Sequence, residues 1–179
     1  EPTQLPEEFN MARTSLQDVQ STADPQLAYN FDLVLPPLPG GGSNRELIIR
    51  CQSTTIPESQ LEQTSIEAHG IKLNFAGRRT WTGTWSATFF ETRTNSTRDA
   101  IIAWQELARS WVGNAGTYKS VYSIPVEIIL YDDLPQIIRR VKMIGVFPTD
   151  TSAPSFDSTS TVVTYAVQFS FDYTEDLAP

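Results

Sequence analysis

The residues with the greatest chemical potential in this chain are few and scattered. His69 is the only histidine and Cys51 the only cysteine among 179 residues. A metal site needs several clustered ligands, and no cysteine or carboxylate stands at ligand spacing around His69. Cys51 lies beside Ile49 in an apolar run with no histidine near it in sequence, a setting typical of a buried, unreactive thiol. We therefore predict structural roles for both.

Acidic and glycine-rich stretches also lack a catalytic pattern. Asp132-Asp133 stand before Leu134-Pro135, where aspartate side chains most often cap a turn. The run Gly40–Gly42 lacks the Gly-Lys-Ser/Thr ending of a phosphate loop and is interpreted as a connector. A hydrolase using Asp132, Asp133 or Glu127 is the weakest hypothesis, because acid–base partners are scarce. We expect no catalytic residues, no metal and no cofactor.

Composition and charge restrict the classes of partner. The net charge is −8 and the pI is about 4.6, which argues against dedicated nucleic-acid binding and against docking on an anionic membrane. No apolar run approaches the ~20 residues needed to span a bilayer. The single cysteine excludes an internal disulfide and is typical of a reducing compartment. A hydrophobic content of 40% suffices for the core of one domain.

Strict alternation of apolar and polar residues predicts a sheet-rich domain. It is clearest over 162–173, where Val163, every second residue after it and Tyr173 share one face. The other predicted strands are Leu27–Leu35, Glu46–Thr55, a hairpin over 71–89 with its turn at Gly77-Arg78-Arg79, and a hairpin over 122–147 with its turn at Asp132–Pro135.

One helix is predicted. Ser96-Thr97-Arg98-Asp99 matches a capping box, with Ser96 as N-cap and Asp99 three residues later. Apolar residues recur at helical spacing from Ile101 to Trp111, and Gly113 follows as a stop signal. The predicted fold is mainly β (α+β): an antiparallel β-sandwich or barrel of about seven or eight strands with one α-helix.

The chain is expected to divide into an arm and one domain. Residues 1–24 are polar, with Pro2, Pro6 and several acids, and we interpret them as an N-terminal arm that is flexible or ordered by a partner. Residues 25–179 form the β domain. Its strands carry apolar residues on parts of both faces, at Ile48, Ile129, Ile138 and Ile144. One helix covers little of such a sheet, so we expect burial against copies of the same chain, the alternative being cover by the helix and the arm.

The order of these elements resembles the tail tube proteins of contractile-tailed bacteriophages, a family related to the inner tube protein of type VI secretion systems. The resemblance covers roughly 27–175 and rests on order and spacing rather than on one motif. The matching stretches are Phe31-Asp32-Leu33-Val34-Leu35, Cys51–Pro57, the helix around Trp104, Tyr122, Gly145-Val146-Phe147-Pro148-Thr149 and Val167-Gln168-Phe169-Ser170-Phe171.

The resemblance implies a structural virion protein rather than an enzyme. Six subunits would form a ring, two long hairpins from each would join into an oligomeric β-barrel, and rings would stack into a tube. Sheath protein would bind outside, while tape-measure protein and double-stranded DNA would pass through the channel without sequence-specific binding. Baseplate and tail-terminator proteins would meet the tube ends. The tube would be assembled in the host cytoplasm and serve genome delivery in the phage tail.

Two sets of residues become candidates within that picture. An uncharged hydroxyl ladder would line the channel without gripping phosphates: Thr80, Thr82, Thr84, Ser86 and Thr88. The loop after the second predicted strand would contact the next ring: Thr55, Ile56, Pro57, Glu58 and Leu61.

Two departures keep other hypotheses open. Family members often have glycine after the loop proline, whereas Glu58 follows Pro57 here, and the arm is longer than is usual. These features favour a tube-initiator or tube-terminator ring as the alternative. A β-sandwich binding module, with Trp81 and Trp85 as a sugar platform, is the more remote alternative, because both residues alternate with Ala87 as a core face would.

Overall fold

The computed structural model describes residues 26–154 and 162–178. The predicted arm, residues 1–24, lies outside the described residues. The strands are β1 (Phe31–Val34), β2 (Cys51–Thr54), β3 (Ser59–Ala68), β4 (Ile71–Trp81), β5 (Thr84–Phe90), β6 (Ile124–Tyr131), β7 (Ile137–Thr151), β8 (Thr164–Ser170) and β9 (Tyr173–Leu177). The helices are α2 (Asn44–Arg50), α3 (Ser96–Ala108) and α4 (Lys119–Tyr122). The mainly-β prediction is confirmed, with more strands and helices in the described part than expected.

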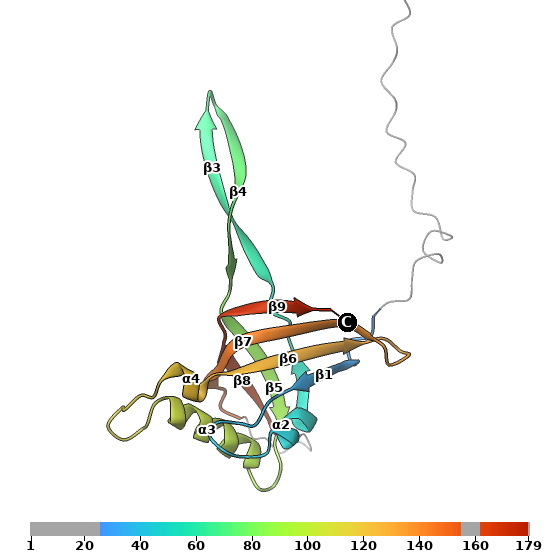
Figure 1. Cartoon of the computed structure of the whole chain (residues 1–179), viewed down its shortest axis with the longest axis vertical. Coiled ribbons are helices and arrows are strands. Elements are labelled where there is room, and N and C mark those ends of the chain that lie inside the picture. The colour runs from blue at the N-terminus through green and yellow to red at the C-terminus, as the bar shows by residue number, and fades with distance from the viewer. Residues whose placement is uncertain (1–25, 155–161, 179) are drawn as a thin grey trace, which may run out of the picture.

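One long strand organises the body into two layers. Six strands of the main sheet follow the order β1-β6-β7-β8-β5-β2, and the seventh, β9, pairs with β7. All pairs are antiparallel. The first part of β7 pairs with β6 and β9, and its last part pairs with β8. We call β1, β6, the first part of β7 and β9 the first layer, and the last part of β7, β8, β5 and β2 the second layer. Figure 1 shows the first layer in front of β8 and β5.

The core lies between these layers, and buried side chains of α3 pack into it. Trp85 packs against Phe169 with ring centroids 4.6 Å apart, and Trp104 of α3 lies 6.0 Å from the same ring. The alternation that predicted the closing strand is confirmed, because Tyr165 and Val167 are also buried. Further buried residues from both layers are Leu33, Ala87, Phe89, Val126, Ile128, Met143 and Val146.

Gly145 is the point at which β7 passes from one layer to the other. Its φ is +74°, a conformation that glycine adopts without steric cost. Any side chain here would overlap the carboxylate of Asp172, which is itself paired with Lys119. Asp172 N donates to the carbonyl of Ile144 at 2.9 Å, so the segment between β8 and β9 is hydrogen-bonded to this bend.

The first predicted hairpin was wrong in its turn. β4 continues through Gly77-Arg78-Arg79, and the turn is His69-Gly70, with φ of +53° and +77°. Positive φ at both central residues is the geometry of a tight hairpin turn. The segment expected to be a polar connection is strand β3, which ends at Ala68. It escaped detection because none of its residues from Gln60 onward is covered by the rest of the chain.

The prediction of a strand over Glu46–Thr55 was wrong in its first half. Residues from Asn44 form helix α2, and the side chain of Ser43 accepts a hydrogen bond from Glu46 N, a standard N-cap. Only Cys51–Thr54 is a strand. The first predicted strand shortens likewise to Phe31–Val34, with Leu27 and Tyr29 exposed. The last one breaks at Phe171-Asp172, so Tyr173 belongs to β9.

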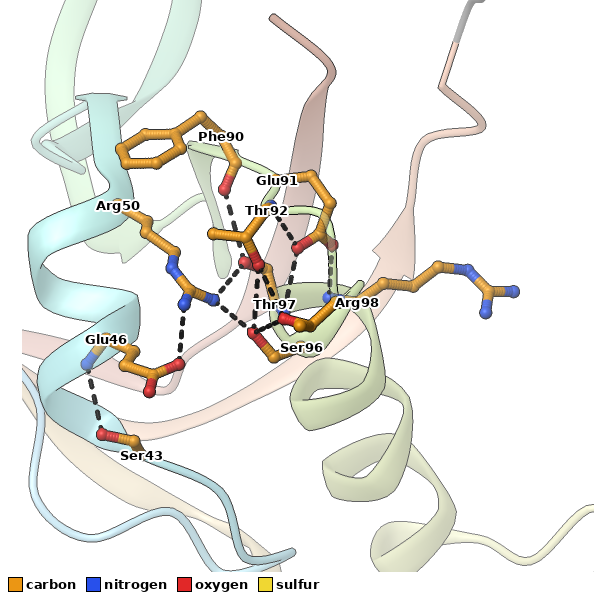
Figure 2. A network of polar contacts seen from close by, with 10 residues as sticks. Ser43, Glu46, Arg50, Phe90, Glu91, Thr92, Ser96, Thr97 and Arg98 are labelled. Atoms are coloured by element: carbon orange, nitrogen blue, oxygen red, sulfur yellow. Dashed lines mark hydrogen bonds and ion pairs between the residues drawn. The ribbon is translucent and has the colours of Figure 1, made fainter.

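The capping-box prediction for α3 was also wrong. The N-cap is Asn95 in a left-handed conformation, and it makes no side-chain cap bond. The carboxylate of Glu91 instead accepts hydrogen bonds from the backbone N–H groups of Thr92, Thr97 and Arg98 at 2.8, 3.2 and 3.0 Å. Figure 2 shows this network. The helix ends at Ala108, so the exposed Trp111 and the predicted stop at Gly113 lie beyond it.

Arg50 extends the network of Figure 2 to helix α2. Its guanidinium donates to the hydroxyls of Ser96 and Thr97 at 2.7 and 2.9 Å and pairs with Glu46 at 2.7 Å. Thr97 is fully buried and donates its hydroxyl to the carbonyl of Phe90. These bonds tie α2, the end of β5 and the start of α3 into one end of the body.

We expect Gly145→Ala to lower the free energy of unfolding by about 2 kcal/mol, through backbone strain and displacement of the half-exposed Asp172 carboxylate from Lys119. Gly41→Ala is the matched control, since Gly41 also has positive φ (+82°) but no atom within 4 Å. It should cost only about 1 kcal/mol. Urea denaturation followed by tryptophan fluorescence measures both, and equal losses would contradict the proposed overlap.

The cap of α3 should make stability depend on pH. Partial burial raises the pKa of Glu91, but the hydrogen bonds from Thr92, Arg98 and Thr97 outweigh it and hold that pKa below its ordinary value of 4.5. A lowered folded-state pKa stabilises the fold above the unfolded value, and that stabilisation is lost as pH falls through the folded value.

We therefore expect Glu91→Gln to cost about 1 kcal/mol at pH 7, a low figure because solvent reaches the carboxylate. The difference from the parent should shrink as pH falls below 4.5. Glu106→Gln, an exposed change on the same helix, should cost little at any pH. A Glu91→Gln penalty that stays constant down to pH 3 would exclude this capping role.

Candidate assembly surfaces

Strands β3 and β4 form a separate two-stranded sheet that projects away from the body (Figure 1). Every residue from Gln60 to Ala68 and from Ile71 to Ala76 is exposed. An isolated hairpin of this kind is marginally stable in water, because neither face buries apolar area. The projection is therefore poorly explained by the stability of a single chain.

The projecting hairpin is amphipathic. Directly opposite residues share a face, and the register places Ile66 opposite Leu73, Ala68 opposite Ile71 and Thr64 opposite Phe75. The intervening residues, Gln63, Ser65, Glu67, Lys72 and Asn74, form a polar face. We call the first set the apolar hairpin face. Its four large side chains are half to two-thirds exposed, at 56% for Ile66, 63% for Ile71, 49% for Leu73 and 51% for Phe75.

A bulge interrupts β4 near the base of the hairpin. Leu61 pairs with Arg79 and Gln63 pairs with Ala76, so Glu62 stands opposite two residues, Gly77 and Arg78. Alternation along β3 is uninterrupted, so Leu61 shares the polar face of Gln63 and Ser65. A bulge increases the local twist of a hairpin. A Cβ at Gly77 would come 2.9 Å from the carbonyl oxygen of Glu62, so the close approach of the strands requires glycine.

The residues predicted to stack rings lie at the base of this hairpin. They are Thr55, Ile56, Pro57, Glu58 and Leu61. Pro57 is buried, Ile56 packs against the core, and Thr55 donates its backbone N–H to the carbonyl of Ser86 at 3.3 Å. Leu61 stands further along β3, on the face opposite the apolar hairpin face. The structure thus brings the first four together as a hairpin root, and their role in stacking stays a prediction.

The residues predicted to line a channel fall on two elements. Thr80 is near the end of β4, Thr82 lies between β4 and β5, and Thr84, Ser86 and Thr88 are on β5. Thr82, Thr84 and Ser86 are exposed. On β5 the ladder stands opposite Ser170, Gln168 and Ala166 of β8, so the outer face is uncharged over these two strands, with Asp150 of β7 beside Gln168. Whether this face lines a channel stays a prediction.

The first layer has a charged outer face instead. Glu127 pairs with Arg140 at 3.0 Å, and Lys142 stands opposite both Glu127 and Glu175. Glu127 is thus occupied by an ion pair. Asp132 accepts a hydrogen bond from the backbone of Asp133 at 2.7 Å, which confirms the predicted turn cap.

The remaining chemical candidates are structural as well. Burial raises the pKa of Cys51 to about 11, so its thiol is protonated at neutral pH. His69 occupies a hairpin turn, and no group of three metal-ligating side chains occurs in residues 26–154 and 162–178. Trp85 is buried and donates its N–H to Thr54 at 2.8 Å, so it cannot form a sugar platform with Trp81. No described helix is long and apolar enough to cross a membrane.

Open strand edges are the third feature of the surface. Within the described chain, β1 pairs only with β6, β9 only with β7, and β2 only with β5. An unpaired edge presents free backbone donors and acceptors to another chain. The first layer therefore ends in an open edge on each side.

The sequence carried a signal for the apolar hairpin face that the prediction missed. Thr64, Ile66 and Ala68 alternate towards His69-Gly70, and Ile71 continues the alternation on the far side. Two alternating runs joined by two residues that tolerate positive φ are a hairpin signature.

Comparisons with known proteins give the fold. No protein-family model matches the sequence, and no curated protein matches it. The tube-terminating cap of the anti-feeding prophage superposes with a TM-score of 0.63 and 14% identity, over 89% of this chain and 95% of that chain. A chain of the sheath–tube complex of the extracellular contractile injection system PVC matches with a TM-score of 0.60 and 16% identity, over 93% and 100%.

The PVC sheath/tube terminator matches similarly, with a TM-score of 0.61 and 14% identity over 88% of this chain and 100% of that chain. The resemblance recognised in the sequence is thereby confirmed at the level of the fold. The chain has a fold found in tube and terminator components of contractile injection systems.

Because the hairpin is exposed on both faces, its amide hydrogens should exchange rapidly in the unassembled protein. Those of β6, inside the first layer, should exchange orders of magnitude more slowly. Hydrogen exchange with mass spectrometry at rising protein concentration should then show protection appearing over β3 and β4. Hairpin amides that stay unprotected in the associated protein would rule out burial of this surface.

Proposed function

We propose that this chain is a non-enzymatic subunit that forms hexameric rings, and that these rings stack into the inner tube of a contractile tail-like particle. The observation that carries the proposal is an apolar hairpin face projecting from a body whose first layer has two open edges. Both features are costly in a monomer and are satisfied together by self-assembly. The shared fold with components of contractile injection systems supports the same conclusion.

The open edges suggest how a ring would close. Successive strands of the first layer are antiparallel, so β1 and β9 run in opposite directions. The free edge of β9 can therefore add to the free edge of β1 in the next subunit as another antiparallel pair. Repetition around a six-fold axis would join the β6–β7 hairpins and their neighbours into a closed barrel that has no edges.

The apolar hairpin face supplies the contact between rings. A contact between one surface patch and a different patch on the next ring propagates head to tail, which builds a tube. Burying four large apolar side chains that are half to two-thirds exposed gives a substantial driving force. The hairpin root at Thr55–Glu58 would adjoin this contact, so the stacking prediction extends to β3 and β4.

The remaining partners follow from the tube geometry. Sheath protein would surround the tube, and baseplate and terminator proteins would contact its ends. A closed barrel of first-layer strands would turn their outer face, with Glu127, Arg140 and Lys142, towards the channel, and the hydroxyl ladder of Thr84, Ser86 and Thr88 on the second layer would face away from it. Acidic and basic side chains are interspersed on that face in a chain of net charge −8. No continuous basic surface would therefore hold tape-measure protein or double-stranded DNA as they pass. Such a protein would be found in the virion after assembly in the host cytoplasm.

A terminator or initiator ring is the second candidate. The likeness to a tube-terminating cap favours it, and so do Glu58 after Pro57 and the long arm. A ring of this kind would use its open edges as the bulk subunit does but would not continue the stack. The two roles separate by the product that the purified protein forms: long tubes or isolated rings.

We expect Ile66→Thr combined with Leu73→Thr to abolish stacking while leaving the subunit folded. These two residues stand opposite each other on the apolar hairpin face, and threonine keeps strand propensity while removing apolar surface. Unfolding free energy should change by less than about 0.5 kcal/mol, because both side chains are exposed in the monomer. Electron microscopy should show rings in place of tubes.

The matched control is Ser65→Thr combined with Asn74→Thr, an opposed pair on the polar face of the same strands. It should leave tubes intact. Normal tubes from the Ile66→Thr/Leu73→Thr protein would contradict stacking through the apolar hairpin face. A parent protein that forms isolated rings under every condition would instead favour the terminator or initiator role.

A further inference from the structure

Two contacts at the base of the projecting hairpin connect it to strand β9. One lies on the β3 side and one on the β4 side, and both reach the same five-residue strand, Tyr173–Leu177. We propose that β9 fixes the angle of the hairpin through these contacts, so that Glu58, Arg139 and Trp81 are positioning residues for ring stacking. This inference rests on the proposed function for its consequence, although the contacts themselves can be tested in the monomer.

The first contact is an ion triad. Arg139 of β7 binds the carboxylate of Asp176 in β9 through two nitrogens, Nε to Oδ1 at 3.0 Å and Nη2 to Oδ2 at 3.3 Å. Its third nitrogen, Nη1, donates to Oε1 of Glu58 at 3.2 Å, immediately before β3 begins. The fork of a guanidinium fixes direction as well as distance, so a bidentate pair holds Arg139 rigidly for Glu58. Asp176 and Glu58 both raise the pKa of Arg139, which keeps it charged.

The second contact is a hydrogen bond from Trp81, the last residue of β4. Its indole N–H donates to the hydroxyl of Thr174 in β9 at 3.0 Å, and its ring packs against the core. Trp81 pairs with Ser59 across the hairpin, so the two contacts hold opposite strands at the same level. Together they resist both rotation and sideways bending of the hairpin.

These contacts matter because little else holds the hairpin at an angle. It joins the body through Pro57 on one side and Gly83 on the other, and Gly83 has φ of +68°, a conformation that permits sharp turns. The one ion pair within the hairpin, Glu62 with Arg78 at 3.7 Å, joins its own two strands and does not reach the body. Without the root contacts the hairpin would pivot about these two connections.

The position of β9 at the sheet edge links the hairpin angle to ring closure. β9 is also the open edge proposed to pair with β1 of the next subunit. Pairing on that edge would immobilise β9, and the hairpin angle would be fixed with it. Ring closure would therefore prepare the apolar hairpin face for stacking, because an already ordered element loses less entropy on binding.

The experiment measures the hairpin angle directly in the full chain. Spin labels are attached to cysteines introduced as Glu67→Cys at the hairpin tip and Thr164→Cys on β8, in a Cys51→Ala background shared by all variants. Double electron–electron resonance then gives the distribution of tip-to-body distances. The test variant is Glu58→Ala with Trp81→Phe, which removes both contacts and leaves the β7–β9 ladder intact. The control is Glu62→Ala with Trp111→Phe, the same chemical changes at sites that do not reach β9.

We expect the test variant to show a broader distance distribution than the parent, while the control matches the parent. Sodium chloride at 1 M should broaden the parent in part, because it screens the exposed triad but leaves the Trp81 bond. In assembly, rings should persist and the critical concentration for stacking should rise about three- to tenfold, the effect of losing one surface ion pair and one hydrogen bond.

An unchanged distance distribution in the test variant would overturn the positioning role, whatever the protein assembles into. A broader distribution with unchanged stacking would show that the angle is set but is unimportant for assembly, which also overturns the proposal. If the parent forms neither rings nor stacks, the proposed function fails while the distance measurement still decides whether β9 holds the hairpin. Arg139→Lys in the parent should also broaden the distance distribution, because lysine cannot form the bidentate pair with Asp176.

Discussion

An amphipathic hairpin with no surface to pack against is the constraint on which the rest of this structure depends. A two-stranded sheet gains most of its stability by burying one face, and residues such as Ile66 and Leu73 remain about half exposed in the single chain. Nothing in the described body bends back to cover them. The free energy of that exposed surface would become available only when another molecule covered it, so in the proposed function the hairpin links folding to assembly.

The body is built to present this hairpin and to leave its own edges free. β7 passes between the layers at Gly145, and this bend brings β8 and β9 to the same side of one long strand. β9 thereby lies at the edge of the first layer and beside the hairpin root at once. The polar network around Arg50 and Glu91 holds the helices at another end of the body, away from the hairpin. The proposed lateral and axial contacts would thus be separated in space but joined through β9.

The parts of the fold that sequence could predict are those stabilised by local burial. The alternation around Phe169, the β6–β7 hairpin with its turn at Asp132–Pro135 and the apolar spacing of α3 all reflect faces that pack within the chain. β3 could not be recognised in this way, because no other part of the described chain covers it, and its only local signal was the alternation of Thr64, Ile66 and Ala68 before His69-Gly70. The Glu91 cap was hidden for another reason: its carboxylate precedes the helix by several residues, and a local capping box at Ser96 offered a simpler pattern. Proximity of Glu58, Arg139 and Asp176 depends on tertiary folding and has no local signature.

Electron cryo-microscopy of the purified, self-associated protein tests the central claim most directly. The account predicts stacked six-fold rings in which β9 pairs with β1 of the adjacent subunit and the apolar hairpin face is buried against the next ring. Two observations would contradict it. One is a monodisperse monomer at high concentration. The other is an assembly in which Ile66, Leu73 and Phe75 remain exposed to solvent.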